Sequence, residues 1–195
     1  MSTETSATPA VTREWNGLTI PAAGTYQLDP AHKRVAFSAR HMMVSKVRGE
    51  FTDAVATITI GEDPLESGVT ATIQTASITT SQDDRDAHLR SADFLDVEKF
   101  PTMEYRSTGI KDHDGDEFVL TGELTIRGVT RPVDLEVEFE GVGRSPFGQD
   151  IFGFSAKAEI DREEFGLVWN VALETGGVLV GKKIVIEIEG EGVRQ

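Results

Sequence analysis

The sequence predicts an all-β fold, in which about eight antiparallel strands close into a barrel and one or two short helical connectors interrupt them. Three observations lead to this prediction. Apolar and polar residues alternate with a period of two from Gly24 onward, each alternating run has a single apolar face, and several runs extend over about ten residues. A two-sheet sandwich of the same strands is the alternative. The barrel is favoured because sandwich strands are usually shorter, and because closure removes exposed strand edges.

The clearest hairpin lies in the middle of the chain. In the run 117–126, five residues share one face, namely Phe118, Leu120, Gly122, Leu124 and Ile126. After a break at 127–130 the alternation resumes, with acids facing the opposite side from Val133, Leu135, Val137 and Phe139. Six further runs are interpreted as strands in the same way: 35–39, 50–60, 68–78, 102–110, 151–160 and 183–192. The segments 42–47 and 82–96 lack the alternation and are the predicted connectors.

The chain is predicted to consist of a flexible N-terminal arm, 1–22, rich in Ser, Thr, Ala and Pro, and one barrel domain, 23–195. The first residues have neither the basic start nor the apolar run of a signal peptide. No stretch reaches the roughly 18 apolar residues of a membrane span. We therefore expect no integral membrane segment and a cytoplasmic protein. The absence of cysteine excludes disulfides and thiolate chemistry.

Acidic residues outnumber basic ones by 33 to 19, which gives a formal net charge of −14. The excess is spread along the chain, and we interpret it as a solubilising surface. Such a surface repels nucleic acid phosphates and anionic lipid head groups. Nucleic acid is therefore excluded as a partner, and direct contact with anionic lipids is not expected.

Signals for catalysis or metal binding are weak. The run GGVLVGKK, 176–183, has the spacing of a phosphate-binding loop, but Lys183 stands where that motif needs Ser or Thr, and a predicted strand follows in place of a helix. No metal site is predicted, because none of the four histidines has a second ligand at helical spacing. No catalytic residue and no catalytic cofactor are nominated.

The segment RDAHLRSADFLDVEKFP, 85–101, is dense in charged residues, and we interpret it first as a structural connector. Thr80 and Ser81 can cap the start of a short helix. Asp86 and Arg90 have the i,i+4 spacing of a favourable ion pair. The segment is long enough to cross one end of a barrel and cover it.

Four apolar residues would pin this connector to the barrel: Leu89, Phe94, Leu95 and Phe100. The alternative is that Arg85, His88 or Arg90 grips the polar part of a ligand. Under either interpretation the lid or pocket mouth is assigned to Arg85, His88, Leu89 and Phe94.

Four separated motifs, in this order, resemble the YceI-like family. They are AHKRVAFSARHMMVSKVRGEF, RDAHLRSADFLDVEKFPTMEY, GELTIRGVTRPVDLEVEF and FGLVWNVALETGGVLVGKKIVIEIE. The resemblance extends from about Gly24 to Gly190. It departs from the family pattern at Lys33, where the family usually has Ser, and in lacking the secretion signal of many relatives.

The resemblance implies a lipocalin-like barrel with an elongated apolar cavity that binds a polyisoprenoid lipid or the tail of an isoprenoid quinone, and a role in binding, storage or transport. Together with the predicted inner face it assigns the lipid-binding residues. These are Val35, Phe37, His41, Phe51, Ile73, Tyr105, Leu120, Leu124, Leu135, Val137, Phe139, Phe152, Phe154, Ala156 and Trp169. The expected partner is a hydrophobic isoprenoid ligand, and a homodimer is possible.

Small residues on the predicted inner face support such a cavity, because a filled barrel would carry larger ones. They are Ala71, Gly122, Ala156 and Ala158. The alternative is that they only accommodate bulky neighbours. Two other functions remain open: an enzyme acting on a lipid-like substrate with His41 or His88 as base, and a packed interaction module that takes no ligand.

Overall fold

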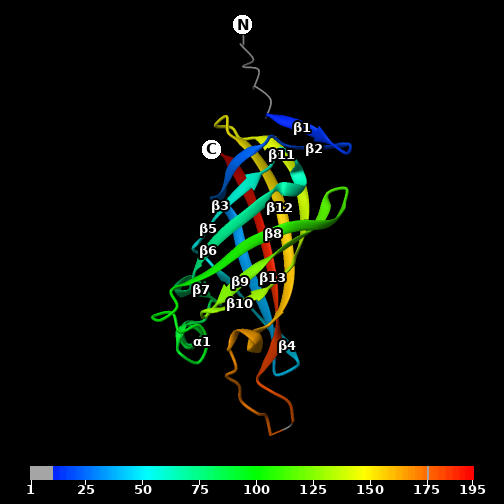
Figure 1. Cartoon of the computed structure of the whole chain (residues 1–195). Coiled ribbons are helices and arrows are strands. Elements are labelled where there is room, and N and C mark those ends of the chain that lie inside the picture. Colours follow the sequence, from blue (N-terminus) through cyan, green and yellow to red (C-terminus); the bar gives the residue numbers. More distant parts are fainter. Residues whose placement is uncertain (1–10, 175) are drawn as a thin grey trace.

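The computed structural model describes residues 11–174 and 176–195, and in this part of the chain eight strands form a closed, elongated antiparallel barrel (Figure 1). The strands of the ring are β3 (Gly24–His41), β5 (Ala54–Ile60), β6 (Gly68–Gln74), β8 (Thr102–Asp114), β9 (Glu117–Ile126), β11 (Leu135–Arg144), β12 (Asp150–Asp161) and β13 (Val180–Arg194). The predicted all-β, eight-stranded barrel is confirmed.

Pairing between the two ends of the domain closes the ring. Strand β13 pairs with β12 on one side and with β3 on the other, in a register that runs from Val180 opposite His41 to Arg194 opposite Tyr26. The upper part of β3 pairs in turn with β5, where Gly24 lies opposite Ile60. Each strand of the ring therefore has a partner on both sides, and the backbone groups that an open sheet leaves at its edges are hydrogen-bonded.

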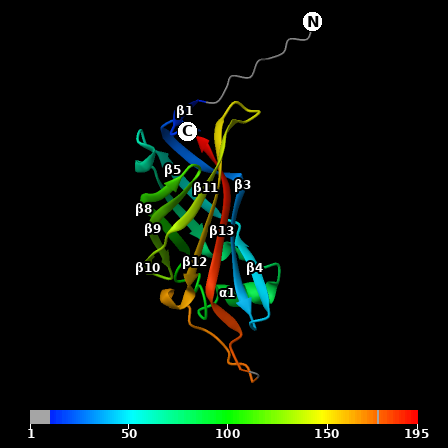
Figure 2. The same cartoon turned by 90° about the vertical axis from the view of Figure 1, so that its right-hand side faces the viewer.

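Shorter elements complete the two ends. Strand β4 (Ser45–Phe51) pairs with the lower part of β3 and with β7 (Ile78–Thr79), and β10 (Val129–Pro132) pairs with β9. The α-helix of the described residues, α1 (Asp83–Arg90), lies at one end of the barrel (Figure 2), where it contacts β7. Single 3-10 turns are η1 (Pro64–Glu66), η2 (Thr75–Ser77) and η3 (Arg162–Phe165). None of these described helices is long and apolar enough to cross a membrane.

The two ends are named by what lies there. The α1 end holds α1, η3, the turn between β3 and β4, and the loop 166–179 (Figure 1). The opposite end is called the hairpin end, because the N-terminal residues 12–21 form a β-hairpin there. The segment 42–47, predicted as a connector, is instead a tight turn that leads directly into β4 at Ser45.

The N-terminal segment corrects the predicted arm. Residues 1–10 lie outside the described residues, but β1 (Thr12–Trp15) and β2 (Leu18–Pro21) pair as a hairpin, so the prediction of a flexible arm up to residue 22 is wrong for 12–21. At the hairpin turn, Asn16 and Gly17 have φ angles of 49° and 81°. This left-handed conformation is the one that an Asn-Gly pair adopts readily in a two-residue loop, and the pair is the sequence signal that the prediction missed.

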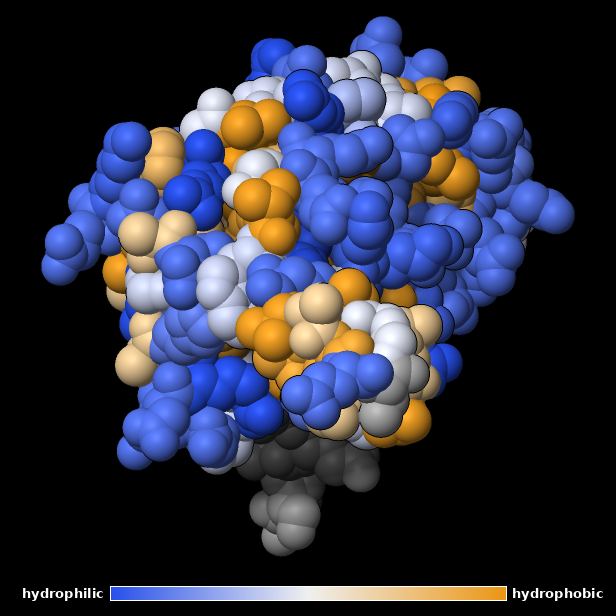
Figure 3. Space-filling model, turned by 90° about the horizontal axis from the view of Figure 1, so that it is seen from below, coloured by the Kyte–Doolittle hydropathy of each residue, from blue (hydrophilic) through white to orange (hydrophobic). Residues whose placement is uncertain are grey.

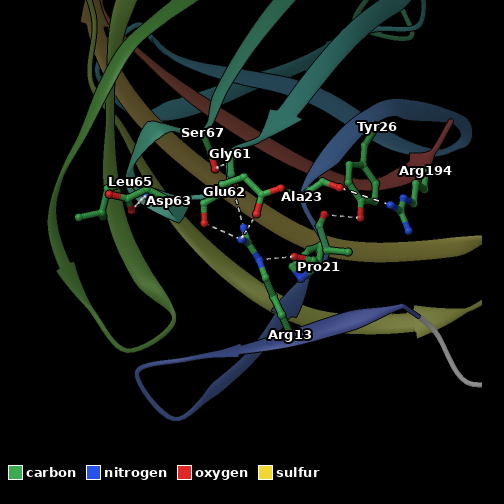
Figure 4. A network of polar contacts seen from close by, with 11 residues as sticks. Arg13, Pro21, Ala23, Tyr26, Gly61, Glu62, Asp63, Leu65, Ser67 and Arg194 are labelled. Carbon is green, nitrogen blue, oxygen red and sulfur yellow. Dashed lines mark hydrogen bonds and ion pairs between the residues drawn. The ribbon is translucent and has the colours of Figure 1, made fainter.

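Arg13 fastens this hairpin to the barrel (Figure 4). Its guanidinium donates hydrogen bonds to the backbone oxygens of Gly61 and Glu62, the latter at 2.6 Å, and Nε donates to Pro21 at 3.3 Å. Nearby, the hydroxyl of the buried Tyr26 donates to the Ala22 oxygen at 2.8 Å. Hydrogen bonds from a charged donor are stronger than those from a neutral one, so the Arg13 contacts hold the hairpin against the barrel.

The start of α1 also differs from the prediction. Gln82, not Thr80 or Ser81, caps the helix, and its side chain accepts a hydrogen bond from the Arg85 backbone N–H. Asp86 does not pair directly with Arg90; it accepts hydrogen bonds from the Thr80 N–H and hydroxyl at 2.8 and 2.5 Å. Burial by itself raises the pKa of Asp86, but these hydrogen bonds outweigh it, so the pKa is lowered.

Arg90 secures the other side of α1. Its Nε donates to the Ala76 oxygen at 2.9 Å, and Nη2 donates to the Ile78 oxygen at 2.6 Å. The predicted ion pair of Asp86 with Arg90 is therefore replaced by two independent attachments of the helix to the segment around β7. These tertiary contacts hold α1 in place, because a helix of eight residues is too short to be stable on its own.

Gly122, one of the small residues of the inner face, makes space for the Tyr105 side chain and adds no space to the cavity. A Cβ atom at Gly122 would lie 2.3 Å from the Tyr105 hydroxyl oxygen and 2.8 Å from the Arg106 backbone oxygen. The Tyr105 hydroxyl occupies this space and donates to the backbone oxygens of Leu120 and Val133, at 3.2 and 3.1 Å. At Gly122 the alternative interpretation of the small residues is therefore correct.

The variant Gly122→Ala is expected to destabilise the barrel by about 1–3 kcal/mol, because the added methyl group must displace the Tyr105 ring or the strand backbone. Gly109→Ala is the matched control, since its Cβ would meet nothing nearer than the Thr121 hydroxyl at 3.4 Å. Denaturant unfolding of both variants measures the difference. Equal loss of stability in the two would contradict this account of Gly122.

Candidate functional site: an apolar cavity through the barrel

A cavity of about 680 Å³ lies inside the barrel. Its walls include residues of the N-terminal hairpin, such as Trp15 and Leu18, and residues of α1, such as His88 and Leu89. It therefore extends between the two ends of the barrel. The volume falls within the roughly 300–1,000 Å³ that is usual for small-molecule sites.

The strand alternation directs apolar side chains into this cavity. On the seam that closes the barrel, Phe37 lies opposite Ile186 and Val35 opposite Ile188, and all four line the cavity. On β13 the acid Glu187 lies between Ile186 and Ile188, and the acid Glu189 follows Ile188. The period of two therefore separates an apolar interior from the acidic exterior.

All fifteen residues assigned to lipid binding line this cavity, and so do the four residues assigned to the lid or mouth. That they contact a lipid remains a proposal. The assignment of lipid-binding residues left out part of the wall, although several of the omitted residues lie on the predicted inner face. The omitted residues include Leu28, Ala39, Val47, Val69, Met103, Ile110, Phe118, Ile160, Leu167, Ile184, Ile186 and Ile188. Most of them lie within the predicted strands, and selecting every apolar residue on the predicted inner faces would have found them. Leu28, Val47 and Leu167 lie outside those strands.

Four aromatic rings, those of Tyr26, Phe139, Phe152 and Phe154, form one cluster. Phe152 packs edge-on against Tyr26 with ring centroids 5.2 Å apart, and it also contacts Phe139 and Phe154 at 6.4 and 6.1 Å. Gly192 makes this arrangement possible, because a Cβ there would lie 2.4 Å from the Phe152 ring. Phe37 and Phe51 form a separate pair with ring centroids 5.7 Å apart.

Most polar side chains of the cavity lie at the α1 end, although Ser67, His113 and Asp116 also line it, with His113 against Trp15 of the N-terminal hairpin. His88 stacks edge-on against Trp169 at 4.5 Å and against Phe94 at 5.0 Å, while its Nε2 lies 2.8 Å from the Asp93 carboxylate. This cluster joins α1 to the loop 166–179, so Trp169 belongs to the end of the cavity and not to its middle. Arg85 uses its Nε and Nη2 on the Thr80 hydroxyl and carbonyl, at 2.7 and 3.0 Å.

Arg162, which sequence reasoning did not single out, is a buried cation at this end. Its guanidinium donates to the backbone oxygens of Gly181 at 3.0 Å and Val180 at 3.4 Å, and also to that of Leu167. Burial lowers its pKa, although the neighbouring acids Glu163 and Asp161 oppose this effect. The side chain fastens the loop 166–179 to the start of β13, and no pattern in the sequence indicates such a role.

A possible metal-ligand group, Asp29, His32 and Glu191, occurs among the described residues outside the cavity lining. His32 Nδ1 lies 2.8 Å from Asp29 and 3.7 Å from Glu191, and its side chain is largely exposed. The hydrogen bond with Asp29 raises the pKa of His32 and lowers that of Asp29. Ion pairing of His32 with Asp29 and with Glu191 accounts for the proximity of the three side chains.

Comparison with known proteins agrees with this geometry. The model of the YceI-like domain matches residues 26–192. The protein YceI of Escherichia coli O6:H1 is 38% identical over 171 residues, which cover 86% of this chain and 87% of that protein. The crystal structure of the Campylobacter jejuni YCEI protein superposes with a TM-score of 0.69 at 30% identity, covering 80% of this chain and 90% of that one.

A second similar structure is a polyisoprenoid-binding domain from Saccharophagus degradans, implicated in plant cell wall breakdown. It has a TM-score of 0.63 and is 10% identical, and the match covers 89% of this chain and all of that domain. At this identity the likeness shows a shared fold.

Burial raises the pKa of the Tyr105 phenol to about 12 from the ordinary value of 10.0. Between these two pH values the folded protein keeps a proton that the unfolded chain releases, so stability is complete below pH 10 and falls as the pH rises toward 12. Tyr105→Phe should make this decline shallower. Unfolding free energies measured by denaturant across the same pH range test this, and an unchanged slope in the variant would contradict it.

Proposed function

The chain belongs to the YceI-like family, and we propose that it binds one long apolar lipid, a polyisoprenoid or the tail of an isoprenoid quinone, lengthwise inside its barrel. The observation that carries this proposal is the elongated apolar cavity of about 680 Å³. The protein would store or transport this lipid, since a long apolar molecule needs a carrier protein in water.

The chemistry of the wall supports a ligand of this kind. Along the barrel, the cavity is lined by aliphatic and aromatic side chains such as Val35, Phe37 and Ile186. A ligand with polar groups along its length would lose hydrogen bonds to water there without replacement. Each isoprene unit transferred from water contributes on the order of 2–3 kcal/mol, so several units give tight binding without polar contacts.

The polar residues at the α1 end support an orientation for the ligand. His88, Arg85 and Gln82 line the cavity there, and His41 lies at the nearby end of β3. A polar head group placed at this end would find donors and acceptors, while the isoprenoid tail extends toward the N-terminal hairpin. The solved polyisoprenoid-binding domain of the same fold supports the choice of isoprenoid over other apolar lipids.

An enzyme acting on a lipid-like substrate is the second candidate, and one observation favours it. The His88–Asp93 hydrogen bond of 2.8 Å is the contact that would orient a histidine base. However, the edge-on packing of His88 against Phe94 and Trp169 gives the ring a structural role as well. Replacement by Gln separates the two functions: an enzyme loses turnover while the lipid is still retained.

Ala156→Trp is expected to reduce lipid retention strongly, because the buried Ala156 faces the cavity between Val137 and Ile188. Purified protein is stripped of lipid, incubated with a polyprenyl lipid and passed through a gel-filtration column, and the lipid that co-elutes is measured. Ser155→Trp is the matched control, since Ser155 is the next residue on β12 and lies opposite Glu138 and Glu189 on the acidic outer face.

Both variants must first show the cooperative unfolding transition of the parent protein. Equal retention by the parent, Ala156→Trp and Ser155→Trp would contradict binding inside the barrel. No retention by any of the three would favour the packed interaction module instead.

A further inference from the structure

The turn between β3 and β4 has a local charge opposite to that of the whole protein. From Ala39 to Gly49 the sequence is ARHMMVSKVRG, which contains three cationic residues and no acid, in a chain whose net charge is −14. The cations Arg40, Lys46 and Arg48 are exposed. We call this hairpin tip, residues 39–49, the basic tip.

The strand register gathers the three cations on one outward face. Arg40 lies directly opposite Lys46, and Arg48, two residues from Lys46 along β4, lies on the same side of the strand. In the described residues 11–174 and 176–195, none of the three is found in an ion pair or a side-chain hydrogen bond. Like charges directly opposite one another destabilise a sheet, so their placement contributes nothing to the stability of the fold.

At the end of the basic tip, apolar side chains face solvent. Met43 is 62% exposed and Val44 is 81% exposed. Met42 and Met43 have φ angles of 51° and 62°, in the left-handed region where tight hairpin turns usually place Asn or Gly. Two methionines in this conformation are unfavourable for the backbone, which points to a role for their side chains.

The loop 166–179 enlarges this apolar surface. The Met42 N–H donates to the Leu179 oxygen at 2.9 Å, so the loop lies beside the tip. On the loop, Val168 is 64% exposed and Val171 is 45% exposed. Viewed from the α1 end, hydrophobic residues gather on one part of the surface with hydrophilic ones around them (Figure 3).

We propose that the α1 end docks on the surface of a membrane that contains anionic lipids. Met42, Met43 and Val44 enter the boundary between head groups and acyl chains, while Arg40, Lys46 and Arg48 contact lipid phosphates. Exposed apolar residues flanked by unpaired cations are the pattern of interfacial membrane binding. The net charge of −14 belongs to the whole chain, and the basic tip itself contains no acid. Charges more than about 8 Å from the tip are largely screened at physiological salt.

The basic tip also adjoins the cavity, since His41, Val180 and Leu179 line its α1 end. Docking there would place the cavity end against the lipid phase. Of the residues proposed to contact the membrane, Arg40 also lines the cavity, but Met42, Met43, Val44, Lys46 and Arg48 do not. The variants that test docking therefore change only residues outside the cavity lining. Failure of lipid retention and failure of docking are therefore separate results.

Charge favours a membrane over a second copy of the chain. In a dimer whose twofold axis passes through the basic tip, the tip would face the same tip of its partner, which places cations against cations. An anionic bilayer instead presents negative charge to all three cations at once, and its interior accepts the apolar side chains.

The test is co-sedimentation of the full chain with vesicles of phosphatidylcholine alone or of phosphatidylcholine and phosphatidylglycerol in equal amounts. We expect binding to the anionic vesicles only, weakened by added salt. Lys46→Ala with Arg48→Ala should lower this binding by roughly 25-fold, at about fivefold for each cation removed. The matched control is Arg106→Ala with Lys157→Ala, which removes the same charge from exposed positions of β8 and β12 and should leave binding unchanged.

Two further variants separate apolar from electrostatic contributions. Met43→Ser with Val44→Ser should weaken binding while keeping its salt dependence, and Glu174→Lys, on the exposed surface of the adjoining loop, should strengthen it. Equal binding to both kinds of vesicle, no binding to either, or an equal loss in the two charge variants would overturn the proposal. So would sedimentation as a dimer that Met43→Ser with Val44→Ser converts to a monomer without any effect on vesicles.

Discussion

The pairing of β13 with β3 is the interaction on which the rest of the structure depends. These strands join the two ends of the domain along a register from His41 opposite Val180 to Tyr26 opposite Arg194. Without this seam the ring would be an open sheet with two free edges, and its apolar face would need another layer to cover it. With the seam closed, the apolar face of the sheet lines the interior of the barrel. The size of the cavity then depends on how completely side chains fill that interior.

The interior is filled in some places and hollow in others, and glycine and alanine act differently in the two cases. Gly122, Gly190 and Gly192 lie against Tyr105, Phe154 and Phe152, so the space they leave belongs to those rings. Ala156, by contrast, faces the cavity. A small residue on an inner strand face therefore marks a cavity only where no aromatic neighbour leans across it.

The architecture was predictable from the sequence because its signal is local. Alternation along β9 and β11 identified both strands and the faces they bury, and all fifteen residues assigned to lipid binding do line one cavity. The missed features depend on tertiary contacts: Arg162 is recognisable only when the carbonyls of Leu167, Val180 and Gly181 converge on it. The N-terminal hairpin was missed for another reason. Its Asn16-Gly17 turn is a local signal in the sequence, but the polar composition of the surrounding residues favoured a flexible arm. The Asp86–Arg90 pair had the right spacing, yet Thr80 and the carbonyls near β7 are better placed partners.

The central claim is that the barrel encloses a cavity that holds one long apolar ligand. Native mass spectrometry of gently purified protein, followed by organic extraction of the same sample, tests it most directly. The account predicts a mass excess that corresponds to one bound lipid per chain and the release of an isoprenoid on extraction. A mass equal to that of the polypeptide, unchanged after incubation with polyprenyl lipids, would contradict it.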